Sequence, residues 1–110
     1  MTYLSVTEAV AALKKHQATM AAYNHALGVL YLDYHPRASK RGGAWCGRYR
    51  NQTYADGVRK APIVTVVCNF SKPAAGQPSL LTADEASTMF HEFGHALHSL
   101  FADVHYYGVA

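Results

Sequence analysis

LLTADEASTMFHEFGHALHSLF, residues 80–101, carries the clearest structural signal in this chain of 110 residues. Thr82 suits the N-cap of a helix, Glu85 stands at the reciprocal position of a capping box, and Asp84 adds a negative charge to the first turn. Apolar residues then recur every three or four positions, which predicts one buried stripe: Ala83, Ala86, Phe90, Phe93, Leu97 and Leu100. We therefore expect a helix over residues 83–102.

The polar face of this helix holds the pattern His91-Glu92-x-x-His95. At about 100° per residue, His91 and His95 lie about 40° apart and one turn along, so both imidazoles can reach one ion. Glu92 lies on the flank of that face, where a carboxylate can accept a proton from water activated by a metal. The spacing predicts a zinc site with His91 and His95 as metal ligands and Glu92 as the catalytic base. The alternative is the polar face of an ordinary helix.

A third zinc ligand is not evident in the sequence. His98 lies about 10 Å along the axis from His91, too far for a straight helix to bring both onto one ion with His95. The longer pattern H-E-x-x-H-x-x-G-x-x-H fails, because His98 stands where glycine is required and Phe101 where histidine is required. Asp103 and His105 stay open as minor alternatives, although each would need a tight reversal of the chain.

The remainder of the chain predicts an α+β fold. Ser5 and Glu8 form a possible capping box for a helix over residues 6–24. The almost continuous apolar run 61–70 indicates a central strand, and Asp56-Gly57 suits the turn of a hairpin that leads into it. The other expected strands cover residues 28–34, which Pro36 ends, and 45–55.

Composition narrows the class of protein. Half of the residues are hydrophobic and 15% are charged, which fits one globular domain. Cys46 and Cys68 form no CxxC motif, so we expect two reduced, structural thiols. The N-terminus lacks a secretory signal and no stretch has the length of a membrane span, so we expect a soluble chain that does not bind membranes, with the cytoplasm as the default compartment.

The chain has a net charge of +3, and residues 37–60 form a basic stretch. Trp45, Tyr49 and Tyr54 lie among its cations, a pattern that also occurs on surfaces that bind single-stranded nucleic acid. We favour the simpler interpretation, a solvated hairpin rim that does not bind nucleic acid. The cations are Arg37, Lys40, Arg41, Arg48, Arg50, Arg59 and Lys60.

Several segments in order resemble the thimet oligopeptidase family of zinc metallopeptidases, which includes oligopeptidase A: YLDYHPRASKRGGAW, VCNFSKPAAGQPSLLTADE and FHEFGHALHSLF. The resemblance runs from about Leu27 to Val104. GGAW and NFSKPAAGQPSLL are most similar to the dipeptidyl carboxypeptidase (peptidyl-dipeptidase) branch. Residues 1–25, the expected helix, match the family poorly.

The resemblance implies a peptidase that hydrolyses short peptides and releases C-terminal dipeptides. It matches His91 and His95 to the first two zinc ligands and Glu92 to the catalytic base. It also implies a mainly helical zincin-like catalytic domain, in which a small sheet packs beside the H-E-x-x-H helix.

The resemblance also implies that residues 1–110 are a partial catalytic domain, an internal piece of a larger enzyme. The family's third ligand, a glutamate about two dozen residues after the second histidine, would lie beyond Ala110, as would the groups that stabilise the transition state. We therefore expect the chain alone to have little peptidase activity and to self-associate through apolar patches. A non-catalytic, partner-binding product of a truncated gene is the alternative.

Overall fold

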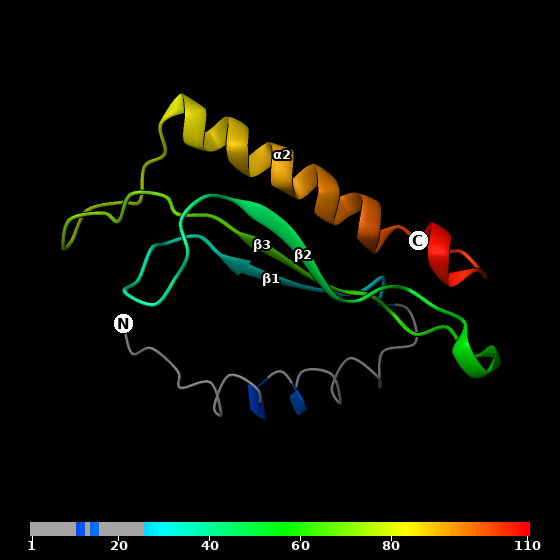
Figure 1. Cartoon of the computed structure of the whole chain (residues 1–110). Helices are drawn as coiled ribbons and strands as arrows, with labels where there is room; N and C mark the ends of the chain where they lie inside the picture. Colours follow the sequence, from blue (N-terminus) through cyan, green and yellow to red (C-terminus); the bar gives the residue numbers. More distant parts are fainter. Residues whose placement is uncertain (1–10, 13, 16–25) are drawn as a thin grey trace.

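The computed structural model describes residues 11, 12, 14, 15 and 26–110. In the described part of the chain from residue 26 on, three strands form one sheet, and one long helix lies over it (Figure 1). The strands are β1 (Val29–Asp33), β2 (Trp45–Arg50) and β3 (Ile63–Val67), and the helix is α2 (Ala83–Leu100). Two short 3-10 turns, η1 (Ala55–Gly57) and η2 (Tyr107–Val109), complete the elements of this part. The α+β class is therefore confirmed. A larger, mainly helical zincin-like domain stays a prediction. Of the helix predicted over residues 6–24, the four described residues are helical and the others lie outside the described part.

The sheet is mixed, with strand order β1-β3-β2. β1 runs parallel to β3, with Val29 opposite Ile63, and β2 runs antiparallel to it, with Cys46 opposite Val66. The apolar run 61–70 therefore supplies the central strand, as predicted. β2 is shorter than the predicted strand 45–55 because its register shifts between Arg48 and Arg50. After that shift, the chain keeps only an isolated bridge between Thr53 and Lys60.

The turn between β2 and β3 follows the prediction for Asp56-Gly57. Asp56 has φ of 63° and Gly57 has φ of 74°, the left-handed values that a type I′ turn requires at both central positions. Lys60 donates from its Nζ to the Asp56 carboxylate across 3.1 Å. We call residues 51–60 the connector.

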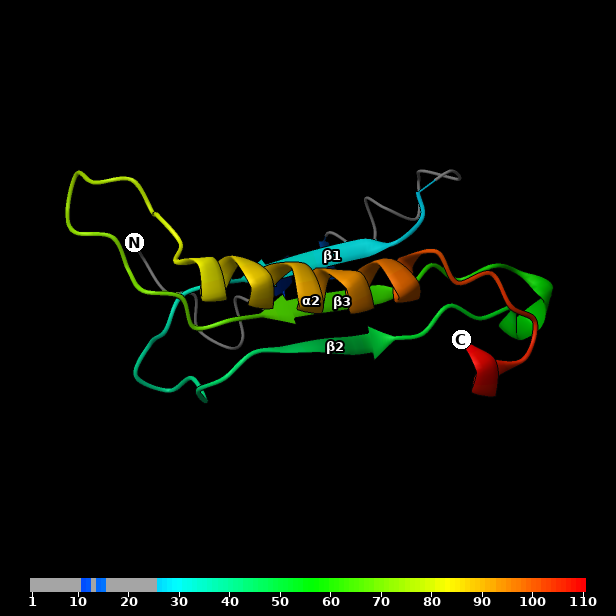
Figure 2. The same cartoon turned by 90° about the horizontal axis from the view of Figure 1, so that it is seen from above.

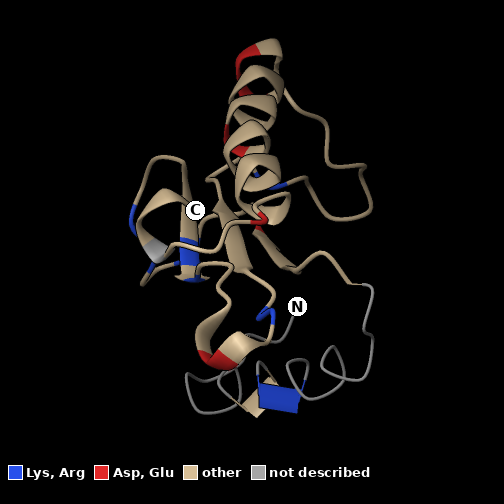
Figure 3. Cartoon of the chain, turned by 90° about the vertical axis from the view of Figure 1, so that its right-hand side faces the viewer, with Lys and Arg blue, Asp and Glu red and all other residues tan. Residues whose placement is uncertain are grey.

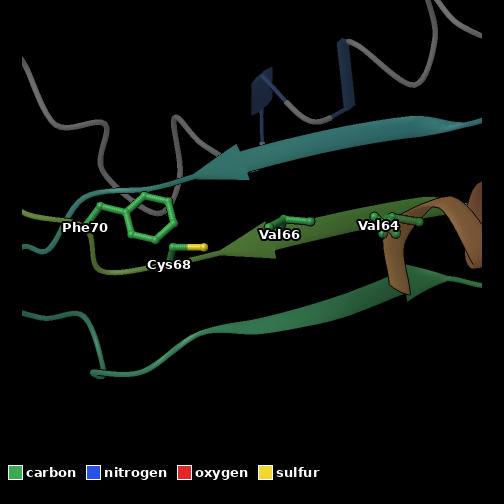
Figure 4. Close-up of a cluster of buried hydrophobic side chains, with 5 residues drawn as sticks. Val64, Val66, Cys68 and Phe70 are labelled. Atoms are coloured by element: carbon green, nitrogen blue, oxygen red, sulfur yellow. The ribbon is translucent and has the colours of Figure 1, made fainter. Parts of the chain in front are cut away.

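The core lies between β3 and α2. Alternate residues of β3 and of the segment that follows it point to the same side and form a row, which Figure 4 shows: Val64, Val66, Cys68 and Phe70. All four are buried, as is Ala96 of α2. The alternation places the opposite side chains of β3, including Thr65, on the other face of the sheet.

The face by which α2 packs differs from the predicted stripe. Figure 2 shows α2 directly above β3. The buried residues of α2 are Ala96 and Ser99, and the half-buried Met89 packs against the edge of the core. Phe90 of the predicted stripe is 70% exposed. The prediction was wrong by roughly a quarter turn of the helix. The physical reason is that small side chains let the helix backbone approach the sheet closely, which large phenylalanine rings would prevent.

Lys40 joins the ends of β1 and β3. Its side chain is 3% exposed, and its Nζ donates to the carbonyl oxygens of Asp33, His35 and Cys68 and lies 3.1 Å from the Asp33 carboxylate. Burial raises the pKa of Asp33, but hydrogen bonds and charge from Arg37 and Lys40 outweigh it and lower that pKa below its ordinary value. Lys40 therefore links these carbonyl groups at the ends of the two strands, where the Asp33 carbonyl also accepts from the Cys68 amide.

Most of the basic stretch is engaged within the molecule. Figure 3 shows basic residues on the strands and connector and acidic residues along α2. Arg37, Lys40, Arg59 and Lys60 have carboxylate partners. The guanidinium of Arg41 lies 4.5 Å from the ring centre of Trp45. Within the described part of the chain, no helix combines the length and apolarity that a membrane span requires.

Gly28 gives a direct test of how closely α2 approaches the sheet. A Cβ at this position would lie 2.7 Å from Cδ2 of Leu100 and 2.9 Å from the carbonyl oxygen of Pro62. We expect Gly28→Ala to lower the free energy of unfolding by about 1–3 kcal/mol in urea denaturation, because the Leu100 side chain and the Pro62 backbone must both shift. Gly42→Ala is the matched control: nothing lies within 4 Å of its Cβ, and a change within about 0.5 kcal/mol is expected. Equal stabilities for the two variants would contradict this packing.

Candidate metal centre

The start of α2 is fixed by the predicted capping box. The Glu85 amide donates to Oγ1 of Thr82 across 3.1 Å, and the Thr82 amide donates to Oε2 of Glu85 across 2.9 Å. The Ser71 amide donates to Oε1 of the same carboxylate across 2.9 Å. These backbone hydrogen bonds, from Thr82 and then Ser71, lower the pKa of Glu85. The cap thus holds the helix to the chain that leaves β3.

His91 and His95 lie on consecutive turns of α2, and both rings are exposed. Their Nε2 atoms are 3.3 Å apart, and the ring planes are inclined by 75°. Two nitrogen ligands about 2.1 Å from one tetrahedral zinc ion are about 3.4 Å apart, so the pair already has the separation that a shared zinc ion needs. The same separation lets one neutral imidazole donate an N–H to the other. The structure therefore brings together the two predicted ligands.

Glu92 is half-buried and faces the sheet, rather than lying out on the flank of the helix. Burial raises the pKa of the Cys46 thiol on β2, and the negative charge of Glu92 raises it further, while Arg48 opposes this. Burial and then Glu92 likewise raise the pKa of Cys68, which follows β3. The carboxylate is thus within electrostatic range of both thiols. Both cysteines are free, as predicted.

The two flanks of α2 face different strands. Leu100 reaches Gly28 at the start of β1. The helical repeat places His91 and His95 on the opposite flank, which is the side of β2. α2 contacts both β3 and β2, and Figure 2 shows β1 and β2 on opposite sides of the helix. The histidines therefore lie beside β2, an edge strand of this sheet, with Glu92 between them and the sheet.

The other candidate ligands lie elsewhere. His98 is exposed one turn beyond His95. Asp103 accepts a hydrogen bond from the Tyr54 hydroxyl across 2.9 Å, which raises the pKa of Tyr54, and His105 stacks on the same Tyr54 ring at 4.6 Å. Among the described residues, no group of three or more His, Cys, Asp and Glu side chains can hold a metal ion. The described part of the chain therefore brings together two of the predicted ligands, His91 and His95, with no third ligand beside them.

Sequence reasoning did not anticipate the contacts between the connector and the end of α2. They join residues about 50 positions apart, and neither helical nor strand periodicity reports such a pairing. The polar residues Gln52 and Tyr54 could have indicated such contacts, but polar residues are equally typical of a solvated hairpin rim.

The chain belongs to peptidase family M3. The family profile of that description matches residues 8–110. The sequence resemblance to zinc oligopeptidases is therefore confirmed at the level of the family, and the match begins well before Leu27.

Curated relatives agree with this assignment. The dipeptidyl carboxypeptidase of Escherichia coli (strain K12) is 48% identical over 80 residues, which cover 73% of this chain and 12% of that protein. Oligopeptidase A of the same organism is 43% identical over 91 residues, 79% of this chain and 13% of the relative. The thimet-like oligopeptidase of Dictyostelium discoideum is 44% identical over 85 residues, which cover 76% of this chain and 12% of that protein. The chain spans roughly an eighth of the length of these relatives.

The capping carboxylate predicts how stability depends on pH. Because the pKa of Glu85 is lower in the folded chain than its ordinary value of 4.5, its contribution is present above that value and is lost as the pH falls through the lower, folded pKa. We expect the free energy of unfolding of wild type to fall more steeply than that of Glu85→Gln as the pH is lowered from about 6 to about 3. Glutamine keeps a capping oxygen but does not titrate. Parallel pH profiles from urea denaturation would contradict this role.

Proposed function

We propose that His91 and His95 are two of the zinc ligands, and Glu92 the general base, of a metallopeptidase that hydrolyses short peptides. The observation that carries this proposal is the 3.3 Å separation of the two Nε2 atoms on adjacent turns, with both rings exposed. The names of the relatives, dipeptidyl carboxypeptidase and oligopeptidase, support peptide hydrolysis and, for the longer protein, release of C-terminal dipeptides.

Bound zinc would polarise the scissile carbonyl and acidify the attacking water. Glu92 would act as the base: it takes the proton of that water and passes it to the nitrogen of the leaving amine. Glu92 is half-buried on the sheet side of the histidine pair, within electrostatic range of Cys46 and Cys68. On the helix it lies between the histidine flank and the fully buried Ala96 and Ser99, which directs it toward the sheet.

The peptide would lie along β2. This strand is an edge of the sheet and borders the histidine flank of α2, so its free main-chain groups can pair with an extended peptide. β1, the other edge, borders the opposite flank, and β3 is central. We therefore assign peptide binding to β2, and the chemistry to the adjacent turns of α2.

Metal binding tests the ligand assignment. We expect the purified chain to bind one zinc ion, and His91→Ala and His95→Ala each to weaken binding by at least roughly tenfold in competition with a chelator. His98→Ala is the matched control and should stay within about twofold of wild type, since its ring is a turn away. Glu92→Gln should also retain zinc, because the carboxylate is a base and not a ligand. Equal losses for His91→Ala and His98→Ala would contradict the assignment.

The same preparations, assayed on a blocked tripeptide, should show little or no cleavage. Two protein ligands leave more of the coordination sphere to water than the three of a catalytic site. Zinc-dependent cleavage of the tripeptide by the 110-residue chain would show that it completes the site by itself, against this account.

A further inference from the structure

The chain that leaves α2 is held by side chains from the connector. The Val104 amide donates to Oε1 of Gln52 across 2.8 Å, and the Gln52 side chain is among the most buried in the described chain. One residue earlier, Asp103 accepts from the Tyr54 hydroxyl and lies 3.5 Å from Nε of Arg59. Figure 2 shows the chain that leaves α2 running beside the connector. We call these contacts the exit clamp.

The connector is itself well ordered by local hydrogen bonds. Thr53 and Lys60 exchange both main-chain bonds, at 3.2 and 2.7 Å. The Ala55 amide donates to Oγ1 of Thr53, and Lys60 pairs with Asp56. Because the connector continues β2 directly, the exit clamp ties the end of α2 to the edge strand next to the histidines.

The exit clamp matters because it holds the end of α2 that follows His95 and makes the closest contacts with the sheet. The fully buried side chains of α2 are Ala96 and Ser99, which are small, and Gly94 lies between the two histidines, where a helix gains little stability. The start of the helix is tied through Glu85 to Ser71. The exit clamp supplies the second tie, so α2 is held at its start and just beyond its end.

We infer that Gln52 and Tyr54 are positioning residues for the metal site: by holding Val104 and Asp103 they keep the C-terminal half of α2, which carries His95, folded and in place over the sheet. This inference rests on the proposed function, since it assigns the exit clamp a role in metal binding. His95 lies eight residues before Asp103, about 12 Å along the helix, so the effect passes through the helix and not by contact with the ion.

The test uses cobalt(II) as the probe, titrated into the 110-residue chain and followed by its visible absorption. We expect Gln52→Met and Tyr54→Phe to raise the cobalt Kd by roughly three- to tenfold. Tyr54→Phe keeps the ring that stacks on His105 and serves if Gln52→Met does not fold. Hydrogen exchange should become faster over residues 96–103 and stay unchanged over residues 84–90 in both variants.

Two control substitutions test whether the effect on cobalt binding is specific to the exit clamp. Tyr49→Phe removes a hydroxyl from a tyrosine of β2 that is 72% exposed, and it should leave cobalt binding unchanged. Asp103→Asn keeps an acceptor for Tyr54 and should retain most of the affinity that Tyr54→Phe loses. Wild-type cobalt affinity in both Gln52→Met and Tyr54→Phe would overturn the inference, even if exchange at the helix end became faster. If the wild-type chain binds no cobalt, the proposed function itself fails, a result distinct from equal affinities.

Discussion

The close approach of α2 to the central strand β3 is the contact on which the rest of the structure depends. Ala96 and Ser99 are small enough for the helix to lie directly over Val64 and Val66, and Gly28 leaves room for Leu100 at the helix end. This contact fixes the rotation of α2. It places Glu92 toward the sheet, the two histidines toward β2, and Phe90 toward solvent.

Local signals in the sequence predicted most of the elements. The capping box at Thr82, the apolar run of β3 and the Asp56-Gly57 turn each depend on neighbours within a few residues, and all three occur. The face of α2 was predicted wrongly because hydrophobicity alone favours Phe90 over Ala96, whereas packing against a flat sheet favours the smaller side chain. The contacts of Gln52 and Tyr54 could not be predicted, since they depend on how two distant segments are folded together.

The candidate site likewise has features that neighbouring residues determine and features that depend on the whole fold. The spacing of His91 and His95 was sufficient to predict that their rings converge, because a helix determines that geometry by itself. The direction of Glu92 depends on the rotation of α2, and the adjacency of β2 depends on the strand order, so both required the fold. Membership of peptidase family M3 supports a peptidase role, while the chain matches only 12–13% of the length of its curated relatives.

The convergence of the two imidazoles on one ion is the central claim, and long-range proton–nitrogen NMR of the histidine side chains during a zinc titration tests it most directly. We predict that the Nε2 resonances of His91 and His95 shift together and saturate near one equivalent, while those of His35, His98 and His105 stay in place. A shift of only one of the pair, or a larger shift at His98, would contradict the geometry on which the proposed chemistry is based.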